Sequence, residues 1–194
     1  MDANLRERFR AAFYESVRVP ERAAPLKEAA LTGRLGAWTE ALTVVAVEAC
    51  RSIGWQTSAK SHKLDLLPVR RSEYLGMDVM AFADGEKRWR FPAAVMELEN
   101  SADEDHIAYS LWKVLAVRAD LPVVFCYRRR NDEAPALVKH LREEVIGAMG
   151  LAGRVKLEGQ TVLVIGSRNE SGTFPDGFFH WWELEPNTGR FERI

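Results

Sequence analysis

The sequence has little cysteine, no long apolar run and almost no net charge. Only Cys50 and Cys126 are present, and both lie inside apolar segments, which is typical of small buried side chains in a reducing compartment rather than of a disulfide framework. No run of about 18 apolar residues occurs, so no membrane-spanning helix is expected. The first residues are charged and lack the apolar core of a signal peptide. The sequence therefore predicts a cytoplasmic protein without membrane partners.

Motifs for common cofactors and catalysts are also missing. There is no glycine-rich loop of the Walker or dinucleotide-binding type, no Cys-x-x-Cys pair and no Gly-x-Ser-x-Gly nucleophile motif. The histidines are isolated and lack the spacing of zinc ligands; they are His62, His106, His140 and His180. Any chemistry must therefore come from other residues.

The formal net charge of −1 gives the whole chain no strong attraction for nucleic acid. Local basic clusters do occur, and such clusters are usually solvated loops, although some contact phosphates. They lie at Arg70-Arg71, at Lys87-Arg88 with Arg90, and at Arg128-Arg129-Arg130.

The remaining composition, 47% hydrophobic and 28% charged, fits one globular domain over residues 1–194. Hydrophobic periodicity predicts four helices, over residues 2–18, 39–53, 103–117 and 134–149, with Thr39 as an N-cap and Pro20 and Pro25 as breaks. Strands are predicted near residues 55–58, 64–69, 74–82, 91–99, 121–127, 161–167 and 178–184. This order indicates an α/β (α+β) fold, a central mixed sheet flanked by helices.

Three carboxylates lie near the ends of two of these strands. Asp78 belongs to the strand at 74–82, and Glu97 and Glu99 belong to the strand at 91–99, with a hairpin signal at Asp84-Gly85 between them. Antiparallel pairing would bring Asp78 close to the two glutamates, which share one face of their strand. Because buried carboxylates are costly unless paired, a divalent cation such as Mg²⁺ or Mn²⁺ is the simplest compensation.

The pattern of Asp78, eighteen intervening residues and Glu97-Leu98-Glu99 resembles the PD-(D/E)XK nuclease superfamily. The helix at 103–117 and the strand at 121–127 follow where that family's next elements would be. The resemblance covers about residues 38–130, with an N-terminal helix and a C-terminal strand extension outside it. It implies a restriction endonuclease-like core and a divalent-metal-dependent nuclease, most simply a DNA endonuclease in restriction, repair or mobile-element context.

Two positions depart from the family pattern. Met77 stands where the family often has proline, and Glu99 stands where it usually has lysine. Some family members carry glutamate at this position, and in others the lysine has moved to the next helix, where Lys113 is the equivalent here. The family also often adds a carboxylate from its first helix, for which Glu48 is the candidate.

The chemistry of phosphodiester hydrolysis, which needs a metal ion, an activated water and contacts to phosphate, suggests a role for each of these residues. Asp78, Glu97 and the Leu98 carbonyl would hold Mg²⁺ or Mn²⁺, with Glu48 as a further ligand, and Glu99 or Lys113 would orient the attacking water. Residues expected to contact nucleic acid are Asn100, His106, Tyr109, Arg128 and Arg129.

Each residue also has a structural interpretation. Asp78 would then form a buried ion pair with an arginine, and the two glutamates would face solvent at a sheet edge. Trp112, Trp181 and Trp182 are expected in the core or on an edge strand. The aromatic run at 178–182 is a candidate dimer contact, because double-strand cutting by one small domain generally needs two copies.

Three functional hypotheses follow from these residues. The chain is a nuclease, a catalytically inactive restriction endonuclease-like module that binds nucleic acid or a protein partner, or an unrelated α/β protein with a buried salt-bridge network.

Overall fold

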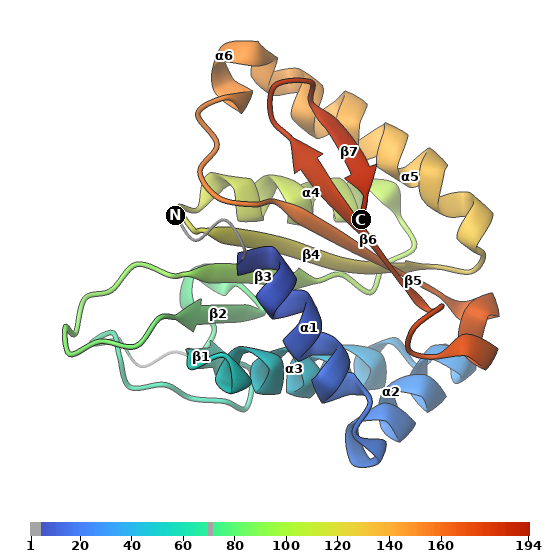
Figure 1. The fold of residues 1–194 in the computed structure, drawn as a ribbon, viewed down its shortest axis with the longest axis horizontal. Helices are drawn as coiled ribbons and strands as arrows, with labels where there is room; N and C mark the ends of the chain where they lie inside the picture. The colour runs from blue at the N-terminus through green and yellow to red at the C-terminus, as the bar shows by residue number, and fades with distance from the viewer. Residues whose placement is uncertain (1–4, 70–71) are drawn as a thin grey trace.

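The computed structural model describes residues 5–69 and 72–194. A seven-stranded mixed sheet lies between two sets of helices (Figure 1), so the α/β class predicted from the sequence is confirmed. The Arg70-Arg71 pair and the first three residues of the helix expected at 2–18 lie outside the described residues.

The helices are α1 (Leu5–Val17), α2 (Pro20–Thr32), α3 (Leu35–Ser52), α4 (Glu104–Ala116), α5 (Ala134–Leu141) and α6 (Gly150–Arg154). The strands are β1 (Gln56–Ala59), β2 (Val79–Phe82), β3 (Ala94–Leu98), β4 (Leu121–Arg128), β5 (Val162–Ser167), β6 (Phe179–Glu185) and β7 (Arg190–Arg193). No described helix is long and apolar enough to cross a membrane.

The strands lie in the sheet in the same order as in the sequence. β1, β2 and β3 pair antiparallel, β3, β4 and β5 pair parallel, and β5, β6 and β7 pair antiparallel. The parallel pairs require crossovers, which α4 and then α5 and α6 provide. The carboxyl ends of β3, β4 and β5 therefore meet at one edge of the sheet, where ligands bind in many α/β proteins.

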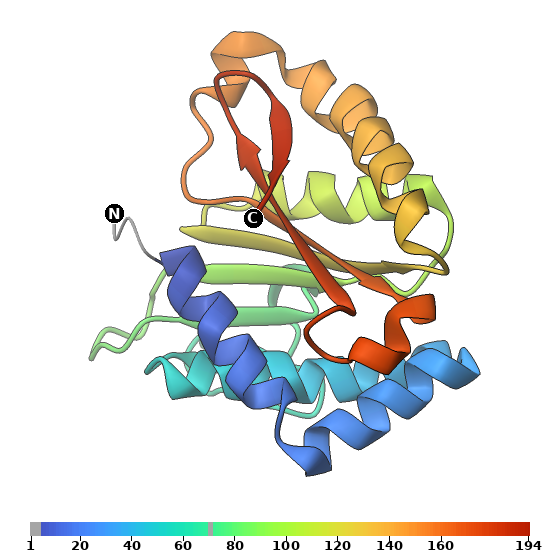
Figure 2. The ribbon, with the colours of Figure 1, turned by 45° about the vertical axis from the view of Figure 1, so that its right-hand side comes forward.

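Alternating side chains divide the core between the two faces of the sheet. Met96 and Leu98 of β3 pack with α1, α2 and α3, whereas Val95 packs with α4 and α5. Figure 2 shows α4 and α5 above the strands, α2 and α3 below them, and α1 crossing in front of the sheet. β4 is buried along its whole length, as its continuous apolar run predicts.

Several predicted boundaries were wrong for identifiable reasons. Pro20 does not break the chain but begins α2, because the first turn of a helix needs no donor there, and α2 also tolerates Pro25 in its interior. The helix expected at 39–53 is α3, which begins at Leu35. The Thr39 hydroxyl therefore lies inside this helix and donates to the Leu35 carbonyl instead of capping its start. The segment at 64–69 forms no strand, and β7 was not predicted.

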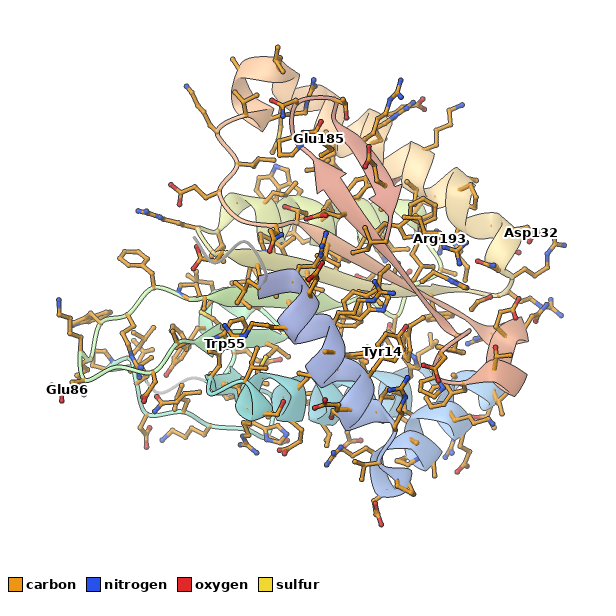
Figure 3. All side chains as sticks on the ribbon, viewed as in Figure 1. Tyr14, Trp55, Glu86, Asp132, Glu185 and Arg193 are labelled. Carbon is orange, nitrogen blue, oxygen red and sulfur yellow. The ribbon has the colours of Figure 1, made fainter. Side chains whose placement is uncertain are left out.

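The antiparallel pairing of β2 and β3 was predicted correctly. The tight turn expected at Asp84-Gly85 was wrong. A long loop, residues 83–93, connects the two strands, and Figure 3 shows it extending from the sheet with Glu86 at its tip. Two large side chains of this loop, Trp89 and Phe91, are exposed. The helix expected at 134–149 is α5 followed by a π-helical turn, Arg142–Ile146, and a short 3-10 turn.

The aromatic run at 178–182 is a core element and not a free interface. Phe178, Phe179 and Trp181 are buried, and the Trp181 ring packs against Phe9 and Phe13 of α1. The expectation of a dimer contact formed by this run was therefore wrong, because its large rings are already used inside the molecule.

Candidate functional site

Asp78 and Glu97 face each other at one end of the β2–β3 pair. The register pairs Val79 with Met96, so the next residues along, Asp78 and Glu97, are cross-strand neighbours on the α4 side of the sheet. One carboxylate oxygen of Asp78, Oδ2, accepts a 2.7 Å hydrogen bond from the Leu98 backbone N–H. Glu97 is only 6% exposed. The pairing of β2 with β3 therefore brings Asp78 and Glu97 close together, as the sequence predicted.

Burial disfavours the charged form of both groups. Desolvation raises the pKa of Glu97 to about 7, and the Lys113 ammonium opposes this rise while the Asp78 charge adds to it. Desolvation also raises the pKa of Asp78, which the Leu98 N–H and Lys113 lower in part. The neighbouring Glu73 and Glu99 charges raise it further. The pair is therefore short of positive charge even with its lysine in place.

Lys113 of α4 lies beside this carboxylate pair and forms an ion pair with Glu97. Its Nζ lies 2.8 Å from Glu97 Oε1 and donates a 2.8 Å hydrogen bond to the Gly76 carbonyl. The lysine is on α4, the helix expected at 103–117, and not at the position of Glu99. Asp78, Glu97 and Lys113 form the cluster that we call the carboxylate–lysine site.

Glu99 lies on the same sheet face but interacts with the start of α4. Its Oε1 accepts a 2.8 Å bond from the Ser101 N–H, and its Oε2 accepts a 3.1 Å bond from the Ser110 hydroxyl. Because both carboxylate oxygens are bonded, Glu99 serves first to hold the helix that carries Lys113.

The backbone beside the site is strained. Among the described residues, two that are not glycine have a positive φ: Leu75, with φ 56°, and Ser61, with φ 62°. Leu75 lies in the turn that presents the Gly76 carbonyl to Lys113, and Ser61 lies in the turn that follows β1. Unusual backbone of this kind concentrates at functional sites, so its position here is informative.

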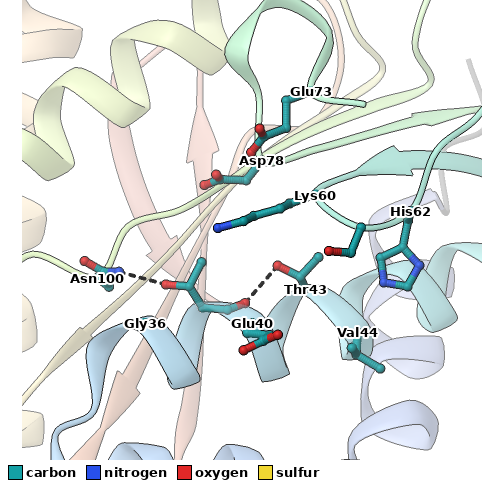
Figure 4. Close-up of a pocket in the computed structure, with 11 residues that line it drawn as sticks. Gly36, Glu40, Thr43, Val44, Lys60, His62, Glu73, Asp78 and Asn100 are labelled. Carbon is teal, nitrogen blue, oxygen red and sulfur yellow. Dashed lines mark hydrogen bonds between the residues drawn. The ribbon is translucent and has the colours of Figure 1, made fainter. Parts of the chain in front are cut away.

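A cavity of about 310 Å³ opens beside Asp78, between α3 and the turn after β1 (Figure 4). Its size is at the lower end of small-ligand sites. The residues that line it are Gly36, Thr39, Glu40, Thr43, Val44, Lys60, Ser61, His62, Glu73, Asp78 and Asn100. Of these residues only Asp78 and Asn100 were predicted as site residues from the sequence, because the others do not belong to a motif. The turn at 59–62 has no glycine or proline to mark it.

Asn100 joins the carboxylate–lysine site to this cavity. Its Nδ2 donates a 2.8 Å hydrogen bond to the Thr39 hydroxyl, and the Thr43 hydroxyl donates to the Thr39 carbonyl at 2.8 Å. The Asn100–Thr39 bond fixes the segment after β3 to α3, whereas the Thr43–Thr39 bond lies within α3. Because the Asn100 Nδ2 is used in the bond to Thr39, its side-chain oxygen is the atom of Asn100 that could contact a ligand.

Other predicted residues lie elsewhere. Glu48 forms a 2.6 Å ion pair with Arg51 and does not line the cavity, where Glu40 is the α3 carboxylate. Arg128 is buried at 8% exposure, and its guanidinium donates to the Ala102 carbonyl at 3.3 Å. Arg128 is therefore used to hold the start of α4, whereas Arg129 is exposed.

The predicted contacts on α4 lie on its outer surface. The ring of Tyr109 stacks on that of Trp112, with centroids 6.0 Å apart and planes at 15°, and both side chains are more than half exposed. Trp112 is thus not the core residue that was expected. His106 is exposed and its Nδ1 lies 3.1 Å from the Ser101 hydroxyl.

The carboxylate–lysine site could hold a hard divalent cation only if water and substrate oxygens complete the coordination. Within residues 5–69 and 72–194, no three His, Cys, Asp or Glu side chains are gathered closely enough to hold a metal by themselves. Mg²⁺, however, is commonly bound through one or two carboxylates and completed by water and substrate phosphates. Two carboxylates with raised pKa values, buried Glu97 and half-buried Asp78, with one lysine beside Glu97, provide that kind of donor set.

Comparison of the chain with protein-family models, curated proteins and solved structures gave no match.

Proposed function

We propose that the chain is a divalent-metal-dependent nuclease that hydrolyses phosphodiester bonds, with DNA as the first substrate to test. One observation carries this proposal. Asp78 and Glu97 face each other across two strands, with Lys113 at 2.8 Å from Glu97. Two carboxylates and a lysine at the end of an antiparallel pair, followed by a helix and a parallel strand, correspond to the arrangement that the PD-(D/E)XK resemblance implies.

Each residue has a distinct part in this proposal. Asp78 and Glu97 would hold Mg²⁺ or Mn²⁺ together with the Leu98 carbonyl. When bound, the cation would act as a Lewis acid on the phosphate and lower the pKa of a bound water. Lys113 would place its positive charge where negative charge develops on the phosphate oxygens. Glu99 would position α4, because its oxygens already accept bonds from Ser101 and Ser110.

The experiment is cleavage of plasmid and single-stranded DNA with Mg²⁺ or Mn²⁺. The wild-type chain is compared with Asp78→Asn, which keeps an oxygen acceptor for the Leu98 N–H. Glu86→Gln, which neutralises an exposed carboxylate on the loop at the other end of β2 and β3, is the matched control. We expect metal-dependent cutting by the wild type and Glu86→Gln only. Equal cutting by Asp78→Asn would reject the assignment of the site.

A second candidate is a catalytically inactive module of the same fold that binds nucleic acid or a protein partner. The Lys113–Glu97 pair favours it, because an ammonium already neutralises one of the two carboxylates that a cation would need. It predicts DNA binding that is unchanged by chelator and by Asp78→Asn, with no cleavage.

A further inference from the structure

An exposed lysine that no motif marks, Lys60, lines the cavity beside Asp78. Lys60 follows β1 in a turn closed by two backbone hydrogen bonds between Ala59 and His62, of 3.0 and 2.9 Å. Figure 4 shows its amine pointing toward the side of the cavity where Asp78 and Asn100 lie. Within the described ranges Lys60 forms no ion pair, in contrast to Lys113. Its charge is therefore available to a ligand.

The cavity has two chemically different sides. Asp78, Asn100 and Lys60 provide charged and polar groups on one side, and Val44 and His62 lie on the other (Figure 4). Burial, followed by the charge of Arg51, lowers the pKa of His62, so this imidazole is uncharged at neutral pH. One side thus suits an anion held with a cation, and the other suits a flat, weakly polar ring.

The carboxylates of the cavity restrict which anion can bind. Glu40, Glu73 and Asp78 outnumber the single ammonium of Lys60. A free anion would be repelled by this excess of negative charge, whereas a phosphate that shares a divalent cation with Asp78 would not be. The volume of about 310 Å³ admits a small ligand but not a duplex.

We propose that this cavity binds a single unpaired nucleotide next to the scissile phosphate, with Lys60 contacting its phosphate and Val44 and His62 contacting its base. This inference rests on the proposed nuclease function, and it assigns single strands or frayed ends as the substrate class rather than continuous duplex. Lys60 is a phosphate-binding residue in this account, distinct from Lys113, which does not line the cavity and pairs with Glu97 and the Gly76 carbonyl.

The first test uses thymidine monophosphate, which has no internucleotide bond to cut. Its affinity is measured by isothermal titration calorimetry in the presence of Mn²⁺. Lys60→Ala is expected to weaken binding about tenfold or more, because a charge-assisted contact is lost, while Lys60→Arg keeps most of the affinity. The matched control is Lys156→Ala, an exposed lysine near the amino-terminal ends of the parallel strands. Equal binding by wild type and Lys60→Ala would overturn the role of Lys60.

The second test compares a short single strand with a blunt duplex of the same sequence by fluorescence anisotropy. We expect the single strand to bind more tightly, and to lose this advantage in Lys60→Ala. Equal or tighter duplex binding would overturn the substrate assignment.

The two proposals can fail separately. If the wild type cuts DNA but does not bind the monophosphate, the nuclease stands and the nucleotide cavity is rejected. If it binds the monophosphate through Lys60 but cuts no DNA, the cavity stands as a nucleotide-binding site, and the nuclease is rejected together with the scissile phosphate beside it.

Discussion

Asp78 and Glu97 are cross-strand neighbours, and burial raises the pKa of both. A pair of carboxylates in this position weakens the fold unless something positive is added, because Lys113 supplies only one charge. The fold tolerates the pair rather than being stabilised by it, which is expected of a site kept for binding.

The first prediction concerns pH and stability in the presence of chelator. The pKa of Glu97 is about 7 in the folded chain and 4.5 as its ordinary value, so the folded state binds the proton more tightly. The free energy of unfolding should therefore fall as pH rises from about 4.5 to about 7, by at most about 3 kcal/mol from this group. Glu97→Gln should remove this part of the dependence and equal or exceed wild-type stability at about pH 8. Chemical denaturation across this range measures it; a less stable Glu97→Gln at about pH 8 would contradict it.

The second prediction separates the structural part of Lys113 from its part in catalysis. Lys113→Met should lower the free energy of unfolding at about pH 8 by about 1–3 kcal/mol, because it leaves the buried Glu97 without its partner. The loss should shrink near pH 5, where Glu97 is protonated. Cleavage should fall by about a hundredfold or more. Lys139→Met, an exposed lysine on α5, controls for the charge change, and full activity of Lys113→Met would remove Lys113 from the site.

The third prediction distinguishes two adjacent arginines. Arg128→Ala should destabilise the chain by about 1–3 kcal/mol, because the buried guanidinium bonds to the Ala102 carbonyl and lies 3.5 Å from Glu104. Arg129→Ala should leave stability unchanged and weaken DNA binding, lowering the salt slope by about 1. Thermal unfolding and anisotropy at two salt concentrations measure both effects. The reverse pattern would mean that Arg128, not Arg129, faces nucleic acid.

The fourth prediction concerns the stacked rings on α4. Both Tyr109 and Trp112 are exposed, so Tyr109→Ala should change stability by no more than about 0.5 kcal/mol. If bases stack on this pair, the affinity for single-stranded DNA should fall by about 1–3 kcal/mol. Phe91→Ala, an exposed ring on the loop 83–93, is the control. Equal losses in the two variants would show that binding does not depend on the position of the pair.

The sequence was sufficient to predict the meeting of Asp78 with Glu97, since strand alternation and antiparallel pairing depend on local pattern. It also indicated the helix at 103–117, which is α4, and in the structure the Asp103 side chain caps this helix by accepting from the Asp105 N–H at 2.9 Å. Pro20 was misread because proline breaks a helix in its interior but is favoured at the first helical position, and the sequence alone does not distinguish the two.

Other features depend on tertiary packing. The guanidinium of Arg128 bonds back to the Ala102 carbonyl before α4. The turn at 59–62, which no motif marks, brings Lys60 to the cavity that Asp78 also lines. Long side chains in basic clusters look alike in a sequence, whether they end in solvent or in the core.

The most direct test of the account is titration of the purified chain with Mn²⁺ by isothermal titration calorimetry. Wild type and the loop variant Glu86→Gln are compared with Asp78→Asn and Glu97→Gln at about pH 8, above the pKa of about 7 of Glu97. The account predicts one site in the first two proteins and a loss of affinity of about tenfold or more in the other two. Equal Mn²⁺ affinity in all four proteins would contradict it, because the cation would then bind somewhere other than between Asp78 and Glu97.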